Sequence, residues 1–553
     1  MRLFPKGEPK NYSPCSHRSE ASNTRCQDCK VAVSARRKYR WTLIFCLVWP
    51  YALQALDSTI IASALPWIAL DFGKLSQQNW IVSSFNLTSG AFIPFWAQIA
   101  DVFGRNIALS SATMLMLIGS ALCTGAPTNA YGVLLLGRAF QGISASGLSV
   151  LTRTILADKV SLQESAKSWS IFAAVGGFSY GLGPVVGGFL TNVNWRWCFG
   201  INLPIGVFAM VVIFIFLRKH LLGPQPIPEL DETAETGRRT TFIARLTTID
   251  FGGQALFIVG FGLIILALTW GGAAYPWKSG SVLAPLVLGV VIMVAFAEWE
   301  RQFEPGKLLH RKLPRQKPMI PWALLSTRDM GLVFYEGFAT GMSMFSGHDP
   351  DRAGLQLLFF VPGIGAIATL SWALYRGHSP TIFGIMAMAG AGMGLKFMVS
   401  PLHGIGLFRE HRASVIALLG ISMPFGGTIG LTIMSAVFNN TSGLLVKEFD
   451  FSKLRGDSAE MIAARDSVKM GVVWAYVAIV PFLVFSLIGS CFLGNVILGK
   501  ENGPDGVAEN IVIREPYLWY LVRGGKSTSQ NGDEAGGADD KQKTEVMNNE
   551  EAV

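Results

Sequence analysis

The chain has 553 residues, of which 50% are hydrophobic and only 15% are charged, and its mean hydropathy is +0.40. Soluble domains carry about 25% charged residues, so the composition excludes an ordinary soluble protein, and recurring apolar runs of about 20 residues predict an all-α, polytopic membrane protein. The net charge of +9 comes from Lys and Arg residues that flank the apolar runs, so it predicts membrane topology and no nucleic-acid partner.

Residues 1–40 are predicted to form a disordered cytoplasmic tail. They contain ten Lys or Arg residues against three acids, a composition that does not support a packed core. Cys15, Cys26 and Cys29 lie near His17 with a spacing similar to that of zinc sites. Because the segment has almost no apolar residues to fold around a metal, we predict no metal site there, and we expect no cofactor elsewhere.

Six membrane spans are predicted in residues 41–217, which would form an N-terminal six-helix bundle. The loops between them alternate between basic loops and short loops that are nearly free of Lys and Arg. The positive-inside rule therefore places the N-terminus in the cytoplasm. The predicted spans are 41–69, 78–100, 107–126, 130–151, 169–191 and 196–217.

Residues 218–330 are predicted to contain two connectors on the cytoplasmic side and two linker helices. The connector 218–250 carries five Lys or Arg residues, and the connector 300–331 carries seven. The apolar runs 251–270 and 281–299 lie between them and are each long enough to cross a bilayer.

Residues 331–498 are predicted to form a shortened C-terminal bundle, followed by a polar, disordered tail over 499–553. The bundle offers at most five helices, because 331–347 is short and glycine-rich, so the whole chain has twelve or thirteen spans. We expect 331–347 to pack poorly beside an open seam. In the twelve-span layout, the sequons at Asn439 and Asn440 face outward, where they can be glycosylated. The clear spans are 353–375, 380–400, 412–437 and 471–498.

Two charged residues lie within predicted spans of the N-terminal half. Asp57 is in the first span and Arg138 in the fourth, and ionisable residues inside a membrane usually serve proton or substrate movement. We predict that both take part in coupling. The alternatives are structural: Asp57 is a hydrogen-bonded carboxylate, or Arg138 clamps two helices through an anionic or carbonyl partner.

A short motif follows the second span. Asp101, Gly104 and Arg105 lie where the chain turns on the cytoplasmic side. Glycine permits a tight turn, and opposite charges can latch neighbouring helices. We therefore predict a latch at this loop, with an ordinary solvated ion pair as the alternative.

The fifth span is unusually rich in glycine. Residues 176–190 read GGFSYGLGPVVGGFL, in which Gly177 pairs with Gly181, and Gly183 with Gly187, at a spacing of four. Small residues at this spacing let two membrane helices approach closely, and proline removes a backbone donor that would hold the helix straight. We predict a helix that rocks against its neighbours, or alternatively a static packing helix. The residues concerned are Gly181, Gly183, Pro184, Gly187 and Gly188.

Five ordered motifs resemble the major facilitator superfamily, specifically its drug:proton antiporters with fourteen spans. The matching segments are LDSTIIASALP (56–66), AQIADVFGRN (97–106), LGRAFQGISASG (136–147), GLGPVVGG (181–188) and WRWCFGINLPIG (195–206). The chain departs from the family's loop pattern, because Ala97 replaces a glycine, and Val102 and Asn106 stand where basic residues are usual.

The resemblance implies two helical bundles around a central cavity, with two extra linker helices. It also implies export of small amphipathic organic molecules, such as toxins, secondary metabolites or drugs, driven by proton entry. The expected partners are the organic substrate, protons and the lipid bilayer. A monomer in the plasma membrane is expected, with a vacuolar or other internal membrane as the alternative.

Two other functions were weighed against export. A membrane enzyme that uses haem or iron needs histidine clusters, but all seven histidines lie outside the clear spans, so we expect no enzyme. The other alternative is a transport-dead remnant or receptor-like protein of the same fold, which the shortened second half favours.

The basic connectors generate a test of sidedness. Single cysteines introduced into a cysteine-free chain, for example Thr240→Cys in the connector 218–250, should resist a membrane-impermeant reagent in intact cells. The reason is that Lys and Arg load places this connector in the cytoplasm. Labelling before permeabilisation would contradict the predicted topology.

Overall fold

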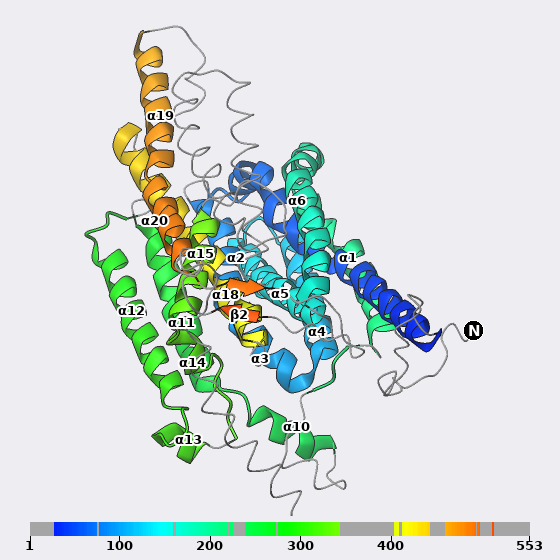
Figure 1. The fold of residues 1–553 in the computed structure, drawn as a ribbon. Helices are drawn as coiled ribbons and strands as arrows, with labels where there is room; N and C mark the ends of the chain where they lie inside the picture. The colour runs from blue at the N-terminus through cyan, green and yellow to red at the C-terminus, as the bar shows by residue number, and fades with distance from the viewer. Residues whose placement is uncertain are drawn as a thin grey trace, which may run out of the picture.

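The computed structural model describes residues 27–74, 77–158, 162–218, 221–224, 238–271, 275–313, 315–342, 403–408, 412–442, 459–493, 495–497 and 511–513. Helices dominate this part of the chain, as the composition predicts (Figure 1). Among the described residues, nine helical segments are long and apolar enough to cross a membrane. The spans predicted at 353–375 and 380–400 lie outside the described residues.

The first helix, α1 (Gln27–Asp71), is longer than the predicted span. At about 1.5 Å per residue, its 45 residues form a helix that is longer than the thickness of a hydrocarbon core, about 30 Å. The part of α1 that could cross the membrane begins at Arg37. In Figure 1 its N-terminal turns project away from the other helices. The predicted disorder of residues 1–40 is therefore wrong for 27–40. No Gly or Pro occurs between Gln27 and Pro50, so a helix that has formed extends at little cost.

The second and sixth predicted spans are each interrupted. Phe92 separates helix α2 (Asn79–Ala91) from helix α3 (Ile93–Phe103). Pro94 lies in the first turn of α3, where its missing N–H does no harm. The sixth span consists of α7 (Trp197–Gly200), α8 (Asn202–Val212) and the π-helix η2 (Ile213–Leu217). The uninterrupted helices are α4 (Arg105–Gly125), α5 (Tyr131–Ala157) and α6 (Leu162–Val193).

The first linker helix packs against the second span. Helix α11 (Phe251–Trp270) approaches α2 so closely that a Cβ at Gly90 would lie 2.8 Å from the ring of Phe261. The rings of Trp80 and Trp270 meet at 5.8 Å. The connectors also contain helices: α10 (Arg238–Leu246), α13 (Leu308–Lys312) and α14 (Trp322–Leu325), while α12 (Gly280–Arg301) is the second linker helix.

The described part of the C-terminal half contains close contacts. Helix α15 (Arg328–Met342) packs on α18 (Arg412–Ser442), where a Cβ at Gly337 would collide with Ser422 and one at Gly426 with the backbone of Phe338. The expectation that 331–347 packs poorly is therefore wrong for residues 331–342, because glycines on both helices allow the backbones to meet. The remaining helices are α19 (Ala459–Val477) and α20 (Val480–Cys491).

Two short strands follow the last helix. Strand β1 (Asn495–Ile497) pairs antiparallel with β2 (Ile511–Ile513). The sequence predicted a helix to residue 498 and a disordered tail over 499–553, and both predictions are wrong at these positions. In the tail, polar composition suggests disorder, but Val512 and Ile511 pair with Val496 and Ile497 of β1.

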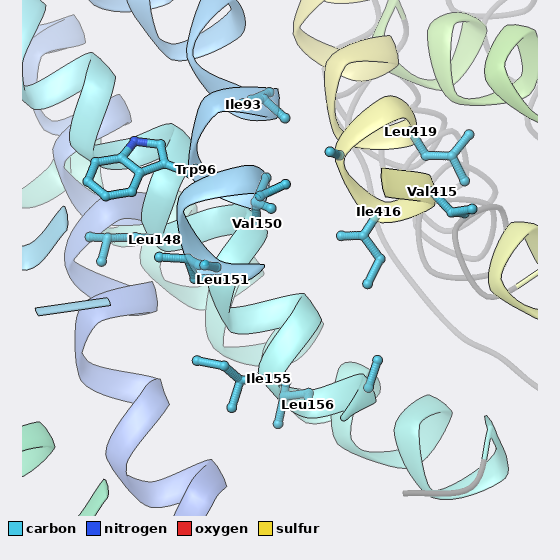
Figure 2. Close-up of a cluster of buried hydrophobic side chains, with 14 of the residues drawn as sticks. Ile93, Trp96, Leu148, Val150, Leu151, Ile155, Leu156, Val415, Ile416 and Leu419 are labelled. Carbon is cyan, nitrogen blue, oxygen red and sulfur yellow. The ribbon is translucent and has the colours of Figure 1, made fainter. Parts of the chain in front are cut away.

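Helix α18 joins the C-terminal half to the N-terminal half. A Cβ built on its Gly420 would make ordinary contacts with Ile93 of α3 at 3.4 Å and Val150 of α5 at 3.7 Å. Figure 2 shows Ile93 and Val150 on one side of this junction and Ile416 of α18 on the other. All three side chains are buried in one hydrophobic cluster, so apolar burial holds the two halves together here.

Candidate functional site

The two charged residues predicted inside spans form an ion pair. Arg138 of α5 donates from Nη1 to Asp57 Oδ2 of α1 at 3.0 Å. The side chains are 1% and 0% exposed. Arg138 therefore has the anionic partner that its position demands, and it joins two helices that are far apart in the sequence.

Other polar side chains complete a network around the pair. Gln141 donates to Asp57 Oδ1 at 2.9 Å and accepts from Arg138 at 2.8 Å. Asn202, at the start of α8, also donates to Asp57, and Gln141 reaches Ser120 of α4 at 2.9 Å. The network therefore ties α1, α4, α5 and α8 together. Gln141, Asn202 and Ser120 are not among the residues predicted from the sequence, although Gln141 follows Arg138 by about one helical turn, a spacing that places both on one face.

Arg138 keeps contacts besides Asp57. Its Nε donates to the carbonyl oxygen of Ile81 at 3.1 Å, and its guanidinium lies 4.4 Å from the ring centroid of Phe85. Both contacts come from α2. Because carbonyl and aromatic partners each favour a cation, Arg138 stays partly stabilised if Asp57 changes its charge.

One of the two glycine pairs on α6 faces α1 beside this network. A Cβ at Gly183 would collide with Thr59, and one at Gly187 with the carbonyl oxygen of Ile60. These α1 residues lie two and three positions after Asp57, so the small-residue face meets the turn that carries the carboxylate. Gly188, by contrast, has no atom within 4 Å of a built Cβ, and α6 continues without a break through Gly181 and Pro184.

The loop motif contains an ion pair between Asp101 and Arg105 and has further partners. Arg105 donates to Asp101 at 2.6 Å and to Asp158, at the end of α5, at 3.0 Å. Gly104 has a φ of 93°, and a Cβ there would lie 2.9 Å from the backbone of Pro224, so only glycine fits.

The connectors also contact this loop. Arg105 donates its backbone N–H to Leu222 at 3.1 Å, and Arg245 of α10 donates to the carbonyl oxygen of Val102 at 2.9 Å. Arg245 thus contacts the motif at Val102, the position at which the family pattern has a basic residue. Neither Asp158 nor Arg245 was singled out from the sequence.

The other candidate residues are placed as follows. Asn440 is exposed in the last turn of α18, which also contains Asn439. No group of three metal-ligating side chains occurs among the described residues, and Cys15, His17 and Cys26 lie outside them.

Glu336 is not among the site residues predicted from the sequence. It is buried in α15 and accepts from Ser486 of α20 at 3.0 Å.

Comparisons with known proteins agree with the motifs. The family model for the Major Facilitator Superfamily matches residues 48–297. The MFS-type transporter pydD of an Acremonium species is 30% identical over 461 residues, which cover 75% of this chain and 76% of pydD. The MFS-type efflux pump LUC4 of a Fusarium species is 33% identical over 334 residues, which cover 60% of this chain and 54% of LUC4. The solved structure of a proton:xylose symporter of the same superfamily is similar with a TM-score of 0.47 and 13% identity, covering 82% of this chain and 95% of that one.

The contrast between two adjacent glycines of α6 gives a test of the helix contact. Gly187→Ala should lower the melting temperature of the purified protein, because its methyl group would collide with Ile60 of α1, and overpacking of this kind costs about 1–3 kcal/mol. Gly188→Ala is the matched control and should leave the melting temperature unchanged, since its methyl group meets open space. Equal melting temperatures for both variants would show that α6 does not pack on α1 in this way.

Proposed function

Because this chain belongs to the major facilitator superfamily and is of the fungal efflux type, we propose that it exports small amphipathic organic molecules in exchange for protons. Membrane transport and efflux follow from the family and from relatives named as efflux pumps. Proton coupling, the substrate class and a location in the plasma membrane are our proposal. We further propose that the protein acts as a monomer.

The observation that carries the proposal is the buried pair of Asp57 and Arg138. A carboxylate enclosed in a membrane helix bundle is costly, and such residues usually serve proton or substrate movement. Asp57 is the group that can load and release a proton, and Arg138 is its counter-charge when the proton is absent. Carrying one charge through 100 mV is worth about 2.3 kcal/mol, which only a titratable group can harness.

Asn202 is suited to serve Asp57 in both protonation states. It donates to the carboxylate through its amide nitrogen, and its Oδ1 has no partner among the described residues. Rotation of the amide would present Oδ1 as an acceptor to a protonated Asp57. The carboxyl group therefore keeps a hydrogen bond to α8 whether it is charged or neutral.

Access to the network from the two sides must alternate for exchange to occur. The contact of α18 with Ile93 and Val150 lies toward the end of the N-terminal helices that carries the loop motif. The pairs of Arg105 with Asp101 and Asp158 lock α3, α4 and α5 at that same end. We propose that the contact of α18 with α3 and α5 holds that end closed in this conformation and separates when substrate is loaded, while the ion pairs keep α3, α4 and α5 together as one unit.

The proposal is tested in proteoliposomes that hold purified full-length protein and a fluorescent amphipathic dye. An imposed pH gradient should drive dye movement by the wild type, and Asp57→Asn should lower the driven rate at least tenfold, because an amide cannot carry the proton. Asp71→Asn is the matched control on the same helix, since Asp71 is about half-exposed and pairs at 3.7 Å with Arg196.

A second variant separates coupling from folding. Removing one partner of a buried ion pair costs about 3–5 kcal/mol, so Asp57→Asn alone leaves Arg138 uncompensated. The double variant Asp57→Asn, Arg138→Gln removes both charges and should insert normally yet remain uncoupled. Proton-driven dye movement by the double variant would reject Asp57 as the coupling site, and a wild type that moves no dye would favour a transport-dead protein.

A further inference from the structure

The two linker helices bring a pair of carboxyl groups together away from the network around Asp57. Asp250 precedes α11, and Glu300 lies near the end of α12. Their exposed fractions are 0% and 1%. A Cβ at Gly253 would lie 3.1 Å from Glu300 Oε1 and would collide with Asp250 Oδ2, so both carboxyl groups border the same glycine.

Asp250 is well supplied with donors. It caps α11 by accepting from the backbone N–H of Gly253 at 2.9 Å, and it accepts from Trp299 Nε1 at 3.0 Å. Such donors stabilise the ionised form of a carboxyl group. Burial raises the pKa of Asp250, and these two hydrogen bonds oppose that rise.

Glu300 has no comparable support. Neither of its carboxyl oxygens has a hydrogen-bond partner among the described residues, although the backbone N–H groups of Met319 and Ile320 lie nearby. The charge that acts on Glu300 is that of the Asp250 carboxylate. The neighbouring cations point elsewhere, because Arg301 pairs with Glu298 at 3.4 Å and Lys317 is exposed.

A buried carboxylate with no cation paired to it is unstable, and such a group takes up a proton instead. Two carboxyl groups that share a site likewise cannot both ionise easily. We propose that Asp250 and Glu300 form a proton-binding site, in which Glu300 holds the proton and Asp250 stays ionised. This site lies outside the Asp57 network and does not depend on the proposed coupling.

The proton at Glu300 stabilises a joint between three parts of the chain. The connector segment 315–320 runs past Glu300 and is fixed on both sides. Lys317 donates its backbone N–H to Thr248 at 3.2 Å, and its carbonyl oxygen accepts from Gln98 of α3 at 3.1 Å. Loss of the proton would place two negative charges beneath this segment, so the docking of the linker helices against α3 becomes sensitive to pH.

Infrared spectroscopy of the full-length protein in lipid nanodiscs tests the site directly. A protonated carboxyl group has a C=O stretch that carboxylates lack. At pH 7 the wild type should show a band that Glu300→Gln loses, whereas Glu298→Gln, which removes an exposed carboxylate on the same helix, should keep it. Identical carboxylic-acid bands in the wild type and Glu300→Gln would overturn the proposal.

A second variant covers the case in which Glu300→Gln does not fold. In the wild type the Glu300 band should disappear as the pH is raised. Asp250→Asn removes the neighbouring negative charge, so the pH midpoint of that loss should move down by about 1 unit or more. An unchanged midpoint would show that the two carboxyl groups do not share a site, and absence of the band at every pH, acidic pH included, would place the proton on Asp250 and overturn the assignment.

Discussion

A charge inside a membrane protein must have its counter-charge within reach, and this requirement fixes the N-terminal half of the chain. Asp57 and Arg138 satisfy it for each other, and Gln141, Asn202 and Ser120 extend the bonding to four helices. The rotation of α1 and α5 about their own axes is thereby set, since any other rotation leaves a charge in lipid. The close contact of Gly183 and Gly187 with α1 then follows, because Thr59 and Ile60 occupy the next turn.

Sequence patterns predicted much of the fold and only part of the site. Apolar length located most of the described spans, and α11 begins and ends where the first linker helix was expected. The sequence also shows that Arg138 needs a partner. That partner, Asp57, lies 81 positions away, and nothing in the sequence indicates which distant residue pairs with Arg138. Similarly, Gly187 and Gly188 are equivalent in the motif, yet only Gly187 faces α1, because adjacent helical residues point about 100° apart.

The connectors and tails were less predictable, because composition describes a segment in isolation. The polar connector 218–250 contains α10, whose Arg245 donates to the carbonyl oxygen of Val102 in the last turn of α3, more than 100 residues earlier. Strand β2 forms by pairing with β1, a contact that no local pattern reveals. Helix α15 is short for a span, but glycines on α15 and α18 allow close packing. In each case a tertiary contact outweighs local propensity.

Two of the buried carboxyl groups differ in their surroundings, and the contrast supports the proposal that Asp57 takes part in proton exchange. No cation pairs with Glu300 among the described residues, so the proton proposed there stabilises the packing of the linker helices. Asp57 faces Arg138, and a proton that binds Asp57 competes with that ion pair. The cost of this competition is limited, because Arg138 retains the carbonyl oxygen of Ile81 and the ring of Phe85. An ion pair with such residual support can open and close within one transport cycle, whereas an arginine with a single partner would stay locked to it.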